Sequence, residues 1–214
     1  MGDRRRSHRN LGDEMNRPED SMEHSPKATG LRLETARLVL RDWKAADVPD
    51  LIEGLNDLRV SQWLAFVPHP YTQTDAGRWI ALCLQFQQEG MRRAQYEFAI
   101  EVSATGKVIG GVSLNRVNRV QGTAGGGIWI NASYQGLGYG SEAFAEKIRF
   151  AFEDLQLRRL ENGFFKGNDA SFAMQQRFGY RLEGKRRQAY LCLADGTLKD
   201  ECMTGLLRAE WLRG

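Results

Sequence analysis

One segment near the middle of the chain constrains its fold more than any other. Residues 128–130 read as a short apolar strand, glycine follows at positions 136, 138 and 140, and Ser141 stands where we expect it to cap an amphipathic helix. Alternating glycines let a backbone adopt positive φ and approach a ligand closely. Free N–H groups and the positive end of the dipole attract an anion to a helix start. The segment therefore predicts a strand–loop–helix cradle for a phosphate or pyrophosphate group.

Two other phosphate-binding motifs fit this loop less well. A P-loop ends in Lys followed by Ser or Thr, and no Lys precedes Ser141 here. A dinucleotide fingerprint has the spacing G-x-G-x-x-G within a parallel unit, whereas this loop has G-x-G-x-G. A tight turn without a ligand would explain one glycine, but hardly three. These comparisons leave an anion cradle of a different type.

Hydrophobic periodicity predicts a single domain that mixes strands and helices. Alternation indicates an antiparallel meander over 96–102, 108–117 and 128–130. Helical spacing follows start signals at Asp47 and Thr74, and again after Ser141 and Asp169. Further strands are predicted at 38–41, 159–165, 188–193 and 203–207. The fold class is thus mixed α/β or α+β, with one domain over residues 31–214 and a polar, charge-rich tail over residues 1–30 that we expect to be disordered.

Composition removes several classes of partner. The net charge of +3 is too small to indicate nucleic acid, and no run of about 18 apolar residues could cross a membrane. The three histidines and three cysteines are too scattered for a zinc set, so we expect no metal. The sequence therefore favours a small anionic ligand over a macromolecular polyanion.

Four segments resemble one family. Residues 135–140, Gln-Gly-Leu-Gly-Tyr-Gly, are similar to the Q/R-x-x-G-x-G/A loop with which GNAT-fold N-acetyltransferases hold the pyrophosphate of acetyl-CoA. Residues 33–41 resemble the opening strand of the branch that acetylates ribosomal-protein N-termini. Residues 168–171 with 178–180, and residues 200–211, resemble two later motifs of that branch. The resemblance covers about residues 31 to 212.

The resemblance implies a cytoplasmic acetyltransferase with acetyl-CoA as co-substrate and a primary amine as acceptor. It implies the GNAT acyl-CoA N-acyltransferase fold, with a central, twisted, mostly antiparallel sheet of about seven strands flanked by helices, and it allows a homodimer. The residues that it assigns to CoA are Ile128, Trp129, Ile130, Gln135, Gly136, Gly138, Tyr139, Gly140, Ser141, Asn168 and Ser171. Asn168 would serve equally as a helix N-cap.

The chain departs from this family where an acid and a base would lie. Many relatives have Tyr as general acid at the position of Gln175, and an acidic residue often begins the strand that here follows Gly125-Gly126-Gly127. Glu97 could act as a base through water, although an exposed strand carboxylate is the plainer interpretation. His69, in the loop between the first two predicted helices, is a second candidate for the base or for substrate binding.

Two questions stay open at this level. Residues 125–127 either leave a wide floor for a bulky acceptor or longer acyl group, or form a loose hairpin, and we favour the hairpin. The acceptor is either a protein N-terminal amine, which we favour, or a small molecule such as an aminoglycoside, polyamine or amino acid. A CoA-binding sensor without catalysis is the alternative outside enzymes.

Overall fold

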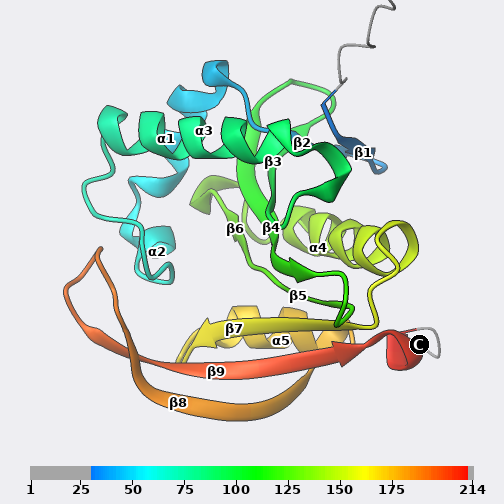
Figure 1. The fold of residues 1–214 in the computed structure, drawn as a ribbon. Coiled ribbons are helices and arrows are strands. Elements are labelled where there is room, and N and C mark those ends of the chain that lie inside the picture. The colour runs from blue at the N-terminus through cyan, green and yellow to red at the C-terminus, as the bar shows by residue number, and fades with distance from the viewer. Residues whose placement is uncertain (1–29, 212–214) are drawn as a thin grey trace, which may run out of the picture.

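A nine-stranded sheet runs through the computed structural model, which describes residues 30–211 (Figure 1). The predicted tail over residues 1–30 therefore lies, apart from Gly30, outside the described residues. The strands are β1 (Arg32–Glu34), β2 (Leu38–Asp42), β3 (Tyr96–Val102), β4 (Val108–Asn118), β5 (Thr123–Gly125), β6 (Ile128–Ile130), β7 (Arg159–Phe165), β8 (Arg181–Leu191) and β9 (Leu198–Leu207).

Neighbouring strands pair antiparallel at every step except one. The order is β1-β2-β3-β4-β5-β7-β9-β8, and β6 pairs with β4 beyond the end of β5. Only β5 and β7 run parallel, and they share just two residue pairs. The predicted meander of three antiparallel strands is confirmed as β3, β4 and β6, and an additional strand, β5, precedes β6. The weakest junction in the sheet thus lies where the two halves meet.

Helices cover the two faces of the first half of the sheet. The helices are α1 (Val48–Leu55), α2 (Leu58–Ser61), α3 (Gln73–Gln88), α4 (Tyr139–Arg149), α5 (Asp169–Arg177) and α6 (Arg208–Trp211). One apolar core joins α4 to strands β2, β3, β4 and β6, and a second joins α1 and α3 to Trp43, Ala99 and Val108. In Figure 1, α1 and α3 lie at one end of the molecule and the β8–β9 hairpin at the other.

The predicted fold class is confirmed, while the number and length of strands differ from expectation. Strands predicted at 96–102 and 159–165 have those bounds. The strand predicted at 188–193 begins earlier, at Arg181, and β1 and β5 bring the total to nine. Residues 181–187 are mostly charged and exposed because β8 is an edge strand, so hydrophobic alternation is absent there.

The cap of α3 differs from the prediction. The helix begins after Thr72 rather than Thr74, because the Thr72 side chain accepts a hydrogen bond from the Asp75 N–H (3.3 Å) and Asp75 accepts one from the Thr72 N–H (2.9 Å). This reciprocal capping box requires an acidic or amide side chain three residues after the cap. Thr74 has Gly77 at that place, so it cannot form one.

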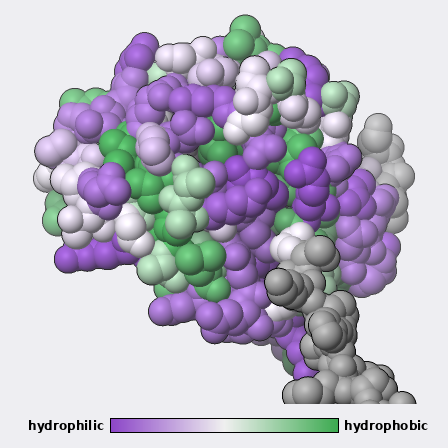
Figure 2. Space-filling model, turned by 90° about the horizontal axis from the view of Figure 1, so that it is seen from above, coloured by the Kyte–Doolittle hydropathy of each residue, from purple (hydrophilic) through white to green (hydrophobic). Residues whose placement is uncertain are grey.

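Among residues 30–211, no helix has the length and apolarity needed to span a membrane, and no group of three potential metal ligands occurs. Figure 2 views the molecule from the side of α1 and α3. Hydrophobic side chains on this face stand in small groups among hydrophilic ones.

Candidate active site

The two halves of the sheet diverge between β6 and β7. Thr123 and Ala124 of β5 pair with β7, whereas Ile128 to Ile130 of β6 pair with β4 and, within the described strands, not with β7 (Figure 1). The polar main-chain groups on that edge of β6 therefore face an opening rather than another strand. Such a fork offers backbone hydrogen bonds to an extended ligand.

Gly125 ends β5, Gly126 and Gly127 form the break between β5 and β6, and the hairpin predicted at residues 125–127 is wrong. The turn lies earlier, at residues 119–122, before β5. A Cβ on Gly126 would lie 2.1 Å from the carbonyl oxygen of Ser113, so only glycine fits there. A Cβ on Gly127 would meet nothing within 4 Å. The break thus passes tightly against β4 at Gly126 and leaves open space at Gly127.

The glycine loop leads into α4, whose N-terminus has no hydrogen bond from a capping side chain. Gly136 and Gly138 have φ of 76° and 83°, which glycine adopts without strain. Gly138 is the N-cap of α4 and supplies no side chain, so the predicted cap at Ser141 is wrong and Ser141 is the third helical residue. The first hydrogen bond in the helix runs from the Glu142 N–H to the Gly138 carbonyl (3.1 Å), which leaves the preceding N–H groups free for a ligand.

Arg37 braces the outside of this loop. Its guanidinium donates to the Leu137 carbonyl (3.1 Å), pairs with Glu142 (2.7 Å) and lies 4.5 Å above the centre of the Tyr139 ring. On the inner side, the Gln135 side-chain amide donates to the Ile130 carbonyl (2.9 Å). These contacts tie the loop to β6 and to the β1–β2 turn. The loop therefore holds its shape through the protein's own bonds and fits a diphosphate at the positive end of α4.

Asn168 and Ser171 lie at the start of α5 and are joined to β9 by a buried polar chain. The Asn168 side chain caps the helix by accepting from the Ser171 N–H (3.1 Å). Gln175, which is 1% exposed, donates to the Ser171 hydroxyl (3.1 Å) and accepts from the Thr204 hydroxyl. The Gln175 amide therefore has hydrogen-bond partners on both its nitrogen and its oxygen and links α5 to β9. An amide has no acidic proton to donate to a leaving group.

A cavity of about 1060 Å³ opens on the other side of β6. Its walls come from the second apolar core, from the loop between α2 and α3, and from the concave face of β7, β8 and β9. Residues 126–129 form part of its lining, so the cavity reaches the fork. Because the glycine loop and the cavity meet at β6, a ligand held on one side could react with a ligand held on the other.

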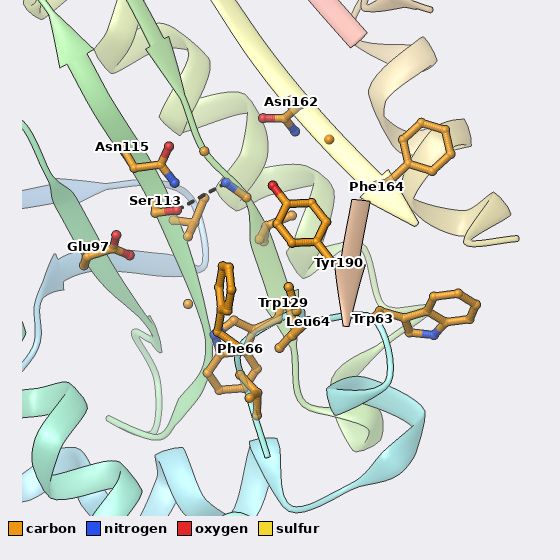
Figure 3. A pocket seen from close by; sticks show the side chains of 18 of the residues that line it. Trp63, Leu64, Phe66, Glu97, Ser113, Asn115, Trp129, Asn162, Phe164 and Tyr190 are labelled. Carbon is orange, nitrogen blue, oxygen red and sulfur yellow. Dashed lines mark hydrogen bonds between the residues drawn. The ribbon is translucent and has the colours of Figure 1, made fainter. Parts of the chain in front are cut away.

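Glu97 is half-buried and faces this cavity from β3 (Figure 3). Among the described residues its carboxylate has neither a hydrogen bond nor an ion pair. Burial raises its pKa from 4.5 to about 8, and the nearby Arg93 guanidinium opposes the rise. The plainer expectation of an exposed strand carboxylate is therefore wrong. A carboxyl group with a pKa of about 8 is ionised in only a fraction of the molecules at pH 7, and that fraction, which grows as the pH rises, can accept a proton.

His69 lies apart from Glu97. It is exposed, in the loop between α2 and α3, and it is not among the residues that line the cavity, although Pro68 and Tyr71 are. Hydrogen bonds from the Arg59 side chain and backbone lower the pKa of the nearby Asp57 carboxylate, and His69 adds only a smaller contribution. The structure thus brings Glu97 to the fork and leaves His69 at the outer surface.

Trp129 lies on the cavity side of β6 and packs against the second apolar core. Its indole occupies the space that side chains at two glycines would need, because a Cβ on Gly54 would be 2.6 Å and one on Gly111 2.7 Å from its ring. Ile130 is buried in the core beneath α4, and Ile128 packs against that core and also lines the cavity. Of the three β6 residues predicted to bind CoA, Trp129 therefore directs its side chain away from the core beneath α4.

Sequence reasoning missed several residues that face the cavity. Ser113 and Asn115 come from β4, and Phe66 and Tyr190 come from a loop and an edge strand far apart in the chain (Figure 3). Period-two alternation from Glu97 could have placed Ser113 and Asn115 on one face, because Ser113 is the direct cross-strand partner of Glu97. Phe66 and Tyr190 carry no such local signal.

Lys147 of α4 lies buried behind the fork. It is 1% exposed, its ammonium nitrogen lies 4.0 Å from the centre of the Phe144 ring, and it lies 3.5 Å from the Asn162 side-chain amide. Burial lowers its pKa from 10.5 to about 7. Among the described residues no carboxylate forms an ion pair with it, so its charged form is poorly compensated.

Comparisons with known proteins agree with this architecture. The sequence profile of the acetyltransferase (GNAT) domain matches residues 37–181. The chain is 29% identical over 165 residues to a Bacillus subtilis protein named "Putative ribosomal N-acetyltransferase YdaF", an alignment that covers 73% of this chain and 82% of the relative.

Two solved structures have the same fold at lower identity. RimL, a ribosomal L7/L12 alpha-N-protein acetyltransferase, is 21% identical with a TM-score of 0.71, over 83% of this chain and 94% of that chain. Spermidine N-acetyltransferase from Vibrio cholerae, in complex with CoA and spermine, is 18% identical with a TM-score of 0.68, over 83% and 99%. With the family profile matching well over half of its length, the chain belongs to the GNAT acetyltransferases.

Proposed function

We propose that this chain transfers the acetyl group of acetyl-CoA directly to a protein N-terminal amine, with Glu97 as the base. The observation that carries the proposal is that a single strand, β6, lines the cavity that contains Glu97 and leads within a few residues into the glycine loop. Two substrates bound next to the same strand would react directly with each other, without a covalent acetyl-enzyme intermediate. Holding both in position is itself a large part of catalysis.

The glycine loop supports acetyl-CoA as the donor. The pyrophosphate would bind the free N–H groups of Gly136, Gly138, Tyr139, Gly140 and Ser141, and the pantetheine arm would extend along the open edge of β6, past Asn168 and Ser171. Acetyl-CoA supplies the acetyl group as a thioester. The loop fits this role because its glycines leave open space or allow positive φ, and its braces do not occupy the anion site.

The Glu97 carboxylate supports proton removal at the acceptor. An amine attacks only in its neutral form, so it must lose a proton before or as the C–N bond forms and the C–S bond breaks. Glu97 would take that proton through a water molecule, and the departing thiolate would take a proton from solvent, because Gln175 has none to give. Backbone N–H groups at the fork would polarise the thioester carbonyl.

The charges of the cavity favour an N-terminal amine over a polyamine. Five carboxylates and four guanidinium groups line it: Asp75, Glu97, Glu161, Glu183 and Glu201, with Arg78, Arg116, Arg159 and Arg186. Ion pairs join Arg159 to Glu161 and Glu183, and Arg186 to Glu201. A cavity so nearly neutral offers little to a molecule with three or four positive charges, whereas an acceptor with one amine suits a cavity in which, among the described residues, only the Asp75 and Glu97 carboxylates lack an ion pair. The 29% identity to YdaF points to the same acceptor class.

The test is release of free CoA thiol from acetyl-CoA with a panel of acceptors. The panel contains short peptides with free N-termini, the same peptides with blocked N-termini, spermidine and an aminoglycoside. We expect turnover of the free peptides, with mass spectrometry showing a gain of one acetyl group at the N-terminus. Turnover of spermidine or the aminoglycoside alone would show that the acceptor is a small molecule and not a protein N-terminus. Tight CoA binding without turnover of any amine would contradict an enzymatic role.

A further inference from the structure

The cavity has one polar side and one aromatic side. Figure 3 shows Glu97, Ser113 and Asn115 on strands β3 and β4, and Phe66, Trp129 and Tyr190 gathered opposite them. The Phe66 and Tyr190 rings meet edge to face with centroids 5.7 Å apart, and Tyr190 also lies 6.0 Å from the Phe165 ring. The rings of Phe66, Tyr190 and Phe165 thus form one continuous aromatic wall, and the Trp129 ring lines the same cavity.

One ring of the aromatic wall is exposed to water, which is energetically unfavourable. Phe66 is 77% exposed, although it lines the cavity and contacts Tyr190. An exposed phenylalanine ring gains free energy when a ligand covers it, roughly 25 cal/mol for each Å² removed from water. Isolated exposed apolar residues need no explanation, but one at the mouth of a cavity beside a second aromatic ring marks a binding surface. The occupant of this surface is therefore apolar.

The loop that carries Phe66 is held in place by the β8–β9 hairpin. The Leu193 N–H donates to the Ala65 carbonyl (3.2 Å), and the Cys192 thiol lies 3.5 Å from the Gln62 carbonyl oxygen. These contacts join the tip of the hairpin to residues 62–65, directly before Phe66. The aromatic wall is therefore preformed across two distant segments of the chain, which lowers the entropic cost of binding.

We infer that the acceptor carries an aromatic or large aliphatic side chain on its first residue, which lies against Phe66, Trp129 and Tyr190 while its α-amine faces Glu97. This inference rests on the proposed function and narrows its substrate class. A cavity of about 1060 Å³ would leave an N-terminal Ser or Ala poorly packed, because those side chains reach little of the aromatic wall. The inference predicts selection at the first residue of the peptide.

The experiment compares peptides that differ only at the first residue: Phe, Leu, Ser and Ala. We expect kcat/KM to be at least about tenfold higher for Phe and Leu than for Ser and Ala, because an apolar side chain gains that much in a fitting pocket. Phe66→Ala should lower kcat/KM about tenfold for the Phe peptide and little for the Ser peptide. Val120→Ala, at a residue that is 92% exposed and outside the cavity lining, is the matched control and should change neither.

A binding measurement separates this inference from the proposed function. The same four peptides are titrated against the protein in the presence of CoA, by calorimetry. Equal turnover of all four peptides, or an equal loss for both peptides in Phe66→Ala, would overturn the aromatic subsite and leave the acetyltransferase intact. Selective binding of the Phe and Leu peptides without turnover would overturn the proposed function and keep the subsite. Neither binding nor turnover would overturn both.

Discussion

Glu97 and Ser113 are direct cross-strand partners on β3 and β4, and both face the cavity beside the fork. The Ser113 hydroxyl accepts a hydrogen bond from the Gly127 N–H (3.2 Å), so the same serine touches the break in the neighbouring strand. Glu97 and the fork are thus separated by one side chain. Under the proposed function, this relationship puts the proton acceptor beside the opening through which an acetyl group would arrive.

Removal of the Glu97 carboxylate should abolish most of the activity. We expect Glu97→Gln to lower kcat roughly 10²-fold, the usual contribution of a general base. Because the Glu97 pKa is about 8, activity of the unchanged protein should rise with pH through about 8. The α-amine of the peptide also titrates at roughly 8, so we expect the rise to become shallower in the variant, where only the peptide amine contributes to it. Glu161→Gln, at an exposed cavity carboxylate paired with Arg159, is the control and should keep the profile. Identical pH profiles of Glu97→Gln and the unchanged protein would assign the base elsewhere.

A side chain at Gly138 should block the anion cradle. Gly138→Val puts a β-branched residue at φ of 83° and over the first turn of α4, and we expect CoA affinity to fall at least about tenfold in calorimetry. Gly196→Val is matched in backbone conformation, since Gly196 has φ of 68° in the β8–β9 turn. A Cβ on Gly196 would meet nothing within 4 Å, whereas one on Gly138 would lie 3.2 Å from the Arg37 guanidinium. Both changes should cost about 1–2 kcal/mol of stability. Equal CoA affinity in the two variants would contradict the cradle.

Gly126 and Gly127 should respond differently to substitution. Gly126→Ala forces a Cβ to within 2.1 Å of the Ser113 carbonyl oxygen, so we expect a loss of about 2 kcal/mol or more in the free energy of unfolding. Gly127→Leu has open space around its Cβ and should fold normally, while its side chain fills the cavity floor and lowers turnover about tenfold or more. Urea denaturation and thiol release measure the two effects. Full activity in Gly127→Leu would show that no substrate occupies the open space beside Gly127.

Lys147 should destabilise the fold near neutral pH. Its pKa is about 7 in the folded protein and 10.5 when unperturbed, so between these values the unfolded chain binds a proton that the folded protein lacks. Its contribution to the free energy of unfolding therefore rises with pH through that window. Lys147→Met should remove this slope and raise stability at pH 7 by roughly 1–4 kcal/mol. Exposed Lys166→Met is the control. A variant less stable than the parent at every pH would mean that the buried ammonium is compensated.

The sequence predicts a structural feature well when that feature depends only on residues close together in the chain. The bounds of β3 and β7 follow from alternation alone, and the glycine spacing after Ile130 indicates the loop that leads into α4. The N-cap of α4 is missed because Ser141 has the usual capping side chain, whereas Gly138 caps through its backbone conformation. The break at Gly126 is missed because only the contact with Ser113 reveals it.

The aromatic wall is the clearest case of a feature that local pattern cannot give. Phe66 and Tyr190 are brought together by the bond between Leu193 and Ala65, which joins segments more than a hundred residues apart in the sequence. The raised pKa of Glu97 likewise arises from burial by other elements. Chemistry that depends on such long-range packing becomes visible only in three dimensions.

The side chains of β6 divide between two faces of the strand. Ile128 and Ile130 pack against the core under α4, Ile128 also lines the cavity, and Trp129 lies between Gly54 and Gly111 on the cavity side. Because successive side chains of a strand point to opposite faces, one inserted or deleted residue would exchange the core-facing and cavity-facing positions. The length of this strand is therefore more tightly constrained than the identity of its side chains, and under the proposed function acceptor preference would change through the surrounding walls.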